Sequence, residues 1–170
     1  MIITKLKVRL YGDPCLREKS KPVKNVGPAE RMLIASMIET MHQHKGIGLA
    51  APQVGINEEI IVADLGEGPV VIVNPEIVKR SGSEIREEGC LSLPGIMVDV
   101  KRAQKIRVKY LNEDNQRMEK EYDDLLARVI LHETDHLKGK LIIDYVPLPQ
   151  EPKLKKKLQA LEEQQRLLKA

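Results

Sequence analysis

One stretch in the C-terminal third of the chain, residues 123–139, places two histidines four positions apart in a segment with the pattern of a single helix. Such positions share one face of a helix, so His132 and His136 can both offer imidazole nitrogens to one metal ion. Glu133 is rotated by about 100° around the helix axis, and its carboxylate can reach a water molecule held by that ion. This is the H-E-x-x-H arrangement of metal-dependent hydrolases, in which the glutamate is the general base.

The ends and the composition of this segment support a buried helix. Asp123 or Asp124 can cap its start, and Gly139 can supply the left-handed residue that ends it. Its apolar residues are Leu126, Val129, Ile130 and Leu137. The alternative, two surface histidines among ordinary charges, predicts a solvent-facing helix, whereas these residues make the helix apolar around much of its circumference. Because unpaired buried polar groups are costly, the pattern favours a metal site.

The size and composition of the chain limit what else it can be. Its 170 residues predict one catalytic domain over 1–150 and an amphipathic C-terminal helix over 151–170, packed on that domain or extending from it. The net charge is only +3, and Phe and Trp are absent, so DNA is not an expected partner. No run approaches the roughly 18 apolar residues of a membrane span. With two cysteines and no signal-peptide pattern, we expect a reducing, cytoplasmic setting.

The remaining pattern predicts an α+β fold. An amphipathic helix is expected over 28–44, followed by a loop of glycines and small residues over 46–55. The strand-like runs are 60–65, 70–73, 77–86, 96–100, 106–111 and 117–122, with a further extended piece at 141–146. A linker over 147–152 and an amphipathic helix over 153–170 complete the chain. A helix, a block of mostly antiparallel strands and two closing helices make an α+β protein.

Two histidines need a third protein ligand to form a catalytic metal site. Glu162 and Glu163 lie at a distance along the chain that suits a thermolysin-like enzyme, but they belong to a tail rich in Lys and Gln. Glu151 is a further candidate. Cys90 lies between strand-like segments after a glycine, in a setting where a thiolate persists, and a metal ion would deprotonate it. An inert core cysteine is the alternative.

Three motifs together resemble one known family. They are GIGLAAPQ at 46–53, EGCLS at 88–92 and HETDH at 132–136. In this order and at these separations they closely resemble the three signature motifs of peptide deformylase. The resemblance implies the deformylase fold, with antiparallel sheets around a central metal-binding helix, and a divalent ion bound by Cys90 and the two histidines. The ion it implies is Fe²⁺, with Zn²⁺, Ni²⁺ or Co²⁺ able to substitute.

The activity implied by the resemblance is hydrolysis of the N-formyl group from N-formylmethionyl peptides, releasing formate. Glu133 would be the acid–base group, and the side-chain amide of Gln53 and the backbone N–H of Leu91 would stabilise the oxyanion. The substrate backbone would add as a strand beside residues 46–48, and its Met side chain would enter an apolar pocket. The substrate-binding residues expected are Gly46, Ile47, Gly48, Leu125 and Val129.

Some residues depart from the family pattern. Leu131 occupies a position that is often Gln, which puts one outer hydrogen bond in question. Arg128 lies one turn before His132, on the face that should border the substrate pocket, where an apolar residue is expected. Asp135 could orient a ligand, meet Arg102 or lie on the surface.

The C-terminal tail and the rival functions leave further alternatives. The lysine-rich start of the tail, at 153–157, fits either a ribosomal RNA partner or a solvated helix start. A small zinc endopeptidase would share HETDH, but the chain leaves little room for a second domain to form a cleft. A non-catalytic metal or peptide-binding module would need neither Glu133 nor Gln53.

Overall fold

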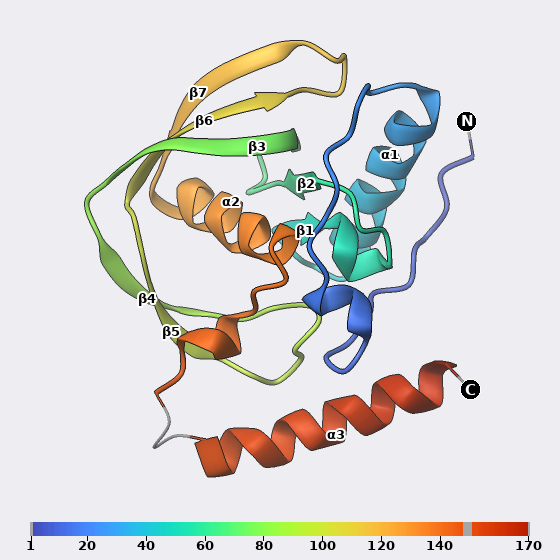
Figure 1. Ribbon diagram of the computed structural model, residues 1–170, viewed down its shortest axis with the longest axis vertical. Coiled ribbons are helices and arrows are strands. Elements are labelled where there is room, and N and C mark those ends of the chain that lie inside the picture. The colour runs from blue at the N-terminus through green and yellow to red at the C-terminus, as the bar shows by residue number, and fades with distance from the viewer. Residues whose placement is uncertain (1, 148–150, 170) are drawn as a thin grey trace.

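The computed structural model describes residues 2–147 and 151–169, and of Glu151 only the backbone. Its centre is the helix α2 (Asp124–Leu137), which lies between two antiparallel sheets (Figure 1). The five-stranded sheet has the order β1-β2-β3-β6-β7, and the two-stranded sheet pairs β4 with β5. These strands are β1 (Gly48–Ala50), β2 (Ile60–Ala63), β3 (Val70–Ser81), β4 (Glu84–Glu88), β5 (Val98–Arg102), β6 (Lys105–Leu111) and β7 (Arg117–Asp123). The predicted α+β class is therefore confirmed.

The remaining elements are helical. They are the helices α1 (Pro28–Gln43) and α3 (Glu151–Lys169) and the 3₁₀ turns η1 (Pro14–Arg17), η2 (Ala51–Val54) and η3 (Ile142–Tyr145). Asp13 caps η1 by accepting a hydrogen bond from the backbone of Cys15 at 3.0 Å. In Figure 1, α3 lies along one side of the molecule. No helix within 2–147 or 151–169 is both long enough and apolar enough to cross a membrane.

Strand β2 explains why α2 is enclosed. All four of its residues are apolar and buried, so the strand packs on both of its faces. Ile60 and Val62 face the cluster built on α1, whereas Ile61 faces the cluster built on α2. Strand β6 alternates exposed and buried residues, and its buried side chains also contact the α2 cluster. The metal motif is thus carried by a helix packed between layers.

Several predicted boundaries are wrong. The expected loop over 46–55 contains β1 and η2, because the backbone at 48–50 pairs with β2. The strand expected over 77–86 is broken at Gly82, whose left-handed φ of 68° turns the chain from one sheet to the other.

Differences also occur near the C-terminus. The extended piece expected over 141–146 is mainly η3, where Asp144 accepts a hydrogen bond from the backbone of Leu141 at 3.0 Å. Such a local bond stabilises a turn where a run of branched residues suggested a strand. The linker expected over 147–152 falls partly on residues 148–150, which lie outside the described residues, and α3 already begins at 151.

Candidate metal centre

Three side chains from two elements converge on one point. His132 and His136 lie one turn apart on α2, and Cys90 lies in the turn after β4. Their ligand atoms all lie within 4.8 Å of one another, and Sγ of Cys90 is 3.4 Å from Nε2 of His136. Ligands at tetrahedral angles around a zinc-like ion stand roughly 3.5 Å apart. A thiolate and two imidazoles at these separations therefore fit a divalent metal ion.

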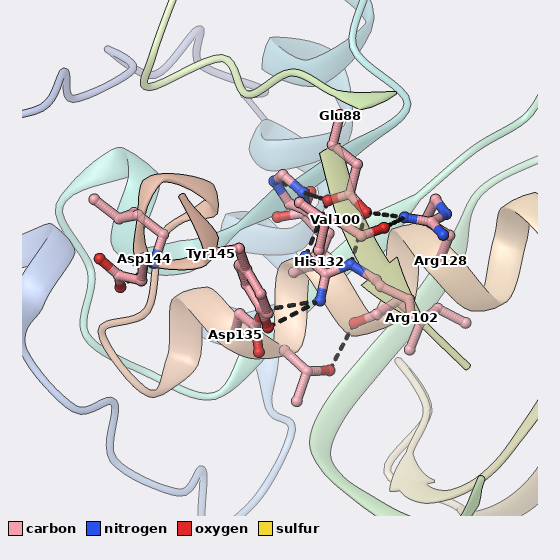
Figure 2. Close-up of polar contacts among 12 residues, drawn as sticks. Glu88, Val100, Arg102, Arg128, His132, Asp135, Asp144 and Tyr145 are labelled. Atoms are coloured by element: carbon pink, nitrogen blue, oxygen red, sulfur yellow. Dashed lines mark hydrogen bonds and ion pairs between the residues drawn. The ribbon is translucent and has the colours of Figure 1, made fainter. Parts of the chain in front are cut away.

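A buried carboxylate orients one of these histidines. Oε1 of Glu88 lies 2.8 Å from Nδ1 of His132 and so fixes the orientation of the ring. When Nδ1 carries the proton, the other ring nitrogen, Nε2, is free to bind a metal ion beside Cys90. Arg102 donates two hydrogen bonds to the same carboxylate, at 2.7 and 2.9 Å (Figure 2). Burial raises the pKa of Glu88, but the hydrogen bonds from His132 and Arg102 outweigh it and lower the pKa to about 2. Glu88 is therefore an ionised support for the ligand.

The network continues on the far side of Arg102. Its Nη1 donates to Oδ2 of Asp135 at 2.9 Å, so of the alternatives left open for Asp135 the structure shows the contact with Arg102. Tyr145 of η3 donates its hydroxyl to the same carboxylate oxygen at 2.7 Å. The segment after α2 is thereby connected to the support of the metal ligands (Figure 2).

Glu133 has the burial and the free oxygen expected of a general base. Its side chain is buried, Oε1 lies 4.0 Å from Nε2 of His132, and Oε2 has no hydrogen-bond partner among the described residues. Burial raises its pKa to about 7, although the charges of His132 and Arg102 act in the opposite direction. A carboxylate with this pKa can accept and return a proton near neutral pH.

Gln53 is held so that its amide NH₂ faces the same site. The backbone N–H of Ala50 donates to Oε1 of Gln53 at 2.9 Å, which fixes the orientation of the amide. Nε2 lies 3.2 Å from Oγ of Ser92 and 3.5 Å from Sγ of Cys90. The donor end of Gln53 therefore points at the ligand cluster.

A cavity of about 480 Å³ opens beside these groups. Every site residue predicted from the sequence except His136 lines it, namely Gly46, Ile47, Gly48, Gln53, Cys90, Leu91, Leu125, Val129, His132 and Glu133. Ile47 and Leu125 are 43% and 40% exposed and form its rim, whereas Val129 is buried. His136 is almost fully buried behind the cavity.

Arg128 and Leu131, the two departures from the family pattern, lie in different surroundings. Arg128 does line the cavity, but its guanidinium bonds Glu88 and two backbone carbonyls. Leu131 packs among the apolar residues around α2. The expected position of Arg128 on the face bordering the cavity is therefore confirmed.

Two of the alternative third ligands, Glu162 and Glu163, do not join the cluster. Glu162 and Glu163 are exposed on α3, and Glu162 lies against Gly12. The side chain of Glu151 lies outside the described residues.

Glu88 and Ser92 are the functional neighbours that sequence reasoning missed. Both belong to the EGCLS motif, but their contacts reach across to α2 and to η2. A carboxylate two residues before a proposed ligand was the available sequence signal for Glu88.

Comparison with known proteins agrees with the metal-dependent site that the geometry suggests. The sequence model of the family described as polypeptide deformylase matches residues 5–152. The chain belongs to the polypeptide deformylase family. It is accordingly a metal-dependent hydrolase that removes the N-formyl group from newly made polypeptides.

Individual deformylases are similar over nearly their whole length. Peptide deformylase from Thermotoga neapolitana is 46% identical over 153 residues, which are 89% of this chain and 93% of that protein. The crystal structure of a peptide deformylase from Legionella pneumophila aligns with a TM-score of 0.89 at 37% identity, covering 96% of this chain and 98% of that one. A peptide deformylase from Synechococcus elongatus, solved in complex with actinonin, aligns with a TM-score of 0.82 at 37% identity, covering 97% and 91%.

Proposed function

We propose that Cys90, His132 and His136 hold one divalent ion, and that Glu133 and Gln53 carry out the deformylation beside it. The observation that supports this most directly is the buried carboxylate of Glu133, which lies beside the converging ligand atoms and has one oxygen without a hydrogen-bond partner in the part of the chain that the structure describes. A bound ion would supply Lewis acidity and lower the pKa of a water ligand.

Residues of the chain would provide proton transfer and stabilisation of the oxyanion. Oε2 of Glu133 accepts the proton of the attacking water and returns it to the departing amide nitrogen. Gln53 Nε2 and the backbone N–H of Leu91 donate to the formyl oxygen as negative charge develops on it. Because Ala50 holds the other end of the Gln53 amide, this donor is oriented before the substrate arrives.

The substrate would bind along the edge of the larger sheet. β1 is its terminal strand, so one edge of Gly48 and its neighbours is available to pair with an extended peptide. The methionine side chain would enter the cavity between Ile47, Leu125 and Val129.

For the metal we propose Fe²⁺, with Zn²⁺, Ni²⁺ or Co²⁺ as substitutes, supported by the resemblance and by a thiolate–imidazole donor set that suits such ions. We place the reaction in the cytoplasm, because the free cysteine at position 90 would remain reduced in such a compartment.

Formate release tests the activity. The purified chain should release formate from formyl-Met-Ala-Ser and leave an acetylated control intact. Actinonin, the compound in the Synechococcus elongatus complex, should inhibit the release. Internal peptide-bond cleavage without formate release would instead support the endopeptidase alternative.

We also propose that the start of α3 approaches the ribosome. Lys153, Lys155, Lys156 and Lys157 are all exposed there, and a cluster of cations suits ribosomal RNA. Truncating α3 is a poor test, because Leu161 and Gln165 are buried in its interface. Changing the four lysines to Gln should instead weaken ribosome co-sedimentation in a salt-dependent manner and spare activity on short peptides. Unchanged co-sedimentation would refute this contact.

A further inference from the structure

Arg128 is a buried cation at the wall of the catalytic cavity. Its side chain is 7% exposed, although it lies on the face of α2 that borders the cavity. Nη1 donates to Oε2 of Glu88 and, at 2.9 Å, to the carbonyl of Val100, and Nη2 donates to the carbonyl of Glu84 at 2.7 Å. One side chain of α2 thereby binds both strands of the β4–β5 sheet (Figure 2).

These contacts complete the surroundings of Glu88. Its Oε1 receives His132 Nδ1 and one nitrogen of Arg102, and its Oε2 receives the other nitrogen of Arg102 and Arg128. A buried carboxylate held by donors on both oxygens has little freedom to rotate. Without Arg128, Oε2 would keep a single side-chain donor, and Glu88 would hold the ring of His132 less firmly.

The same contacts determine what Arg128 presents to the cavity. Its guanidinium is occupied by Glu88 and by two backbone carbonyls, so the hydrocarbon stem is the part available to line the cavity. Leu125 and Val129, which precede and follow it along α2, line the cavity as well. A long charged side chain thus closes the cavity with an apolar surface.

We infer that Arg128 is a positioning residue that joins the substrate side-chain pocket to the metal site. Its guanidinium fixes Glu88, and through it the ligand His132, while its stem sets the width of the pocket. The inference rests on the proposed roles of His132 and of the cavity. It assigns a specific task to the position at which the sequence departs from an apolar expectation.

Metal release measures the first effect without any turnover. Arg128→Met keeps an unbranched stem and removes the donors, and Arg128→Lys keeps the charge without the planar fork. Loss of a direct outer partner of a ligand typically costs about 10- to 100-fold in metal affinity. For Arg128, one contact further out, we expect Zn²⁺ to pass to a chromophoric chelator roughly 3- to 10-fold faster in Arg128→Met, with Arg128→Lys intermediate.

Arg86→Met is the matched control. Arg86 lies on β4, is 43% exposed and pairs with Glu84, so its loss should leave Zn²⁺ release unchanged. Wild-type release rates in both Arg128 variants, with the variants folded by circular dichroism, would overturn the link to His132. If Arg128→Met does not fold, the lysine variant still decides the question.

Substrate preference measures the second effect. Arg128→Ala removes the stem and widens the pocket, and we expect the ratio of kcat/KM for formyl-Phe-Ala-Ser to that for formyl-Met-Ala-Ser to rise by about tenfold. Arg128→Met retains a stem and should keep the wild-type ratio. An unchanged ratio in Arg128→Ala would overturn the assignment of the pocket wall. Absence of formate release by the wild type would refute the proposed function instead and would leave the chelator result standing.

Discussion

Gly48 lies so close to Glu133 that a Cβ atom on the glycine would stand 2.6 Å from Oε1 of the carboxylate. The same atom would stand 2.7 Å from Cγ1 of Val129. Strand β1 and helix α2 therefore meet at the proposed general base with no room for a side chain between them. The glycine of the first motif and the glutamate of the third are one packing unit, although 85 positions separate them in the numbering.

We expect Gly48→Ala to displace Glu133 and to lower kcat/KM by at least about tenfold, since overpacking of this kind costs about 1–3 kcal/mol. Gly46→Ala is the comparison, because its Cβ would meet Cδ1 of Leu91 at 2.9 Å, the end of a flexible side chain. Its loss of activity should be smaller. Steady-state kinetics of both variants test this, and equal activities would contradict the packing argument.

Glu133→Gln should separate metal binding from hydrolysis. Because Glu133 lies beside the ligands without being one of them, we expect the variant to retain stoichiometric metal and the wild-type Tm. Loss of a positioned acid–base group should lower kcat by at least roughly 100-fold. Metal analysis and formate release on the same preparation measure both quantities. Near-normal turnover in a fully loaded variant would remove Glu133 from the mechanism.

The ligand set can be tested against the peptidase alternative. Cys90→Ser should weaken metal binding, because Sγ of Cys90 is one of the three converging atoms proposed to hold the ion. Replacing both Glu162 and Glu163 with Ala should not, since both side chains are exposed on α3. The measurement is the metal content after dialysis against a weak chelator. The opposite pattern would show that the third ligand lies on α3.

Local sequence patterns predicted helix α2 well, but they did not predict contacts between residues that are far apart in the sequence. The expected helix over 123–139 is α2 with its flanking residues, because its amphipathic pattern and the terminal glycine are local signals. The role of Glu88 depends on β4 crossing α2, and 44 positions separate it from His132. The break at Gly82 likewise depends on which strand accepts β4 as a neighbour. No short-range periodicity contains that information.

Arg128 shows the same limit for a single side chain. Helical spacing placed it correctly on the cavity face of α2, but it could not place the two carbonyls and the carboxylate that receive its guanidinium. Those acceptors come from β4 and β5, so an expectation based on hydrophobicity alone could not anticipate them. For Cys90, in contrast, the order and separation of three motifs supplied the long-range relation that spacing lacks.

Metal identity should affect activity more than structure. A thiolate with two imidazoles is a soft site that Zn²⁺ occupies readily, ahead of Fe²⁺ in the divalent affinity order. From the family resemblance we nevertheless expect protein purified without oxygen to carry iron and to lose activity in air. Ni²⁺ should then restore formate release better than Zn²⁺. Elemental analysis and activity of each reconstituted form test this, and a fully active zinc form would contradict it.

Asp13 connects the N-terminal segment to α3, and its contacts make that connection dependent on pH. The carboxylate is buried, and Nε2 of Gln165 and Nζ of Lys169 each lie 3.3 Å from its Oδ2. Burial raises the pKa of Asp13, but hydrogen bonds from Cys15 and Lys169 outweigh it and lower the pKa below its usual value. The stabilisation is therefore complete above the unfolded-state pKa of about 3.9 and is lost as the pH falls through the lower folded-state pKa.

Asp13→Asn should consequently lower the Tm at pH 7, by a few degrees for about 1 kcal/mol in a chain of this size. The difference from the wild type should begin to shrink as the pH falls below about 4, where the carboxylate of the unfolded chain is protonated, and should vanish below the folded-state pKa, where the native carboxylate also loses its charge. Thermal unfolding at a series of pH values measures this difference. Asp114→Asn, in the exposed turn before β7, is the control and should leave the Tm unchanged at every pH. A Tm difference for Asp13→Asn that stays constant from pH 7 to below pH 4 would show that the carboxylate's charge does not hold α3 in place.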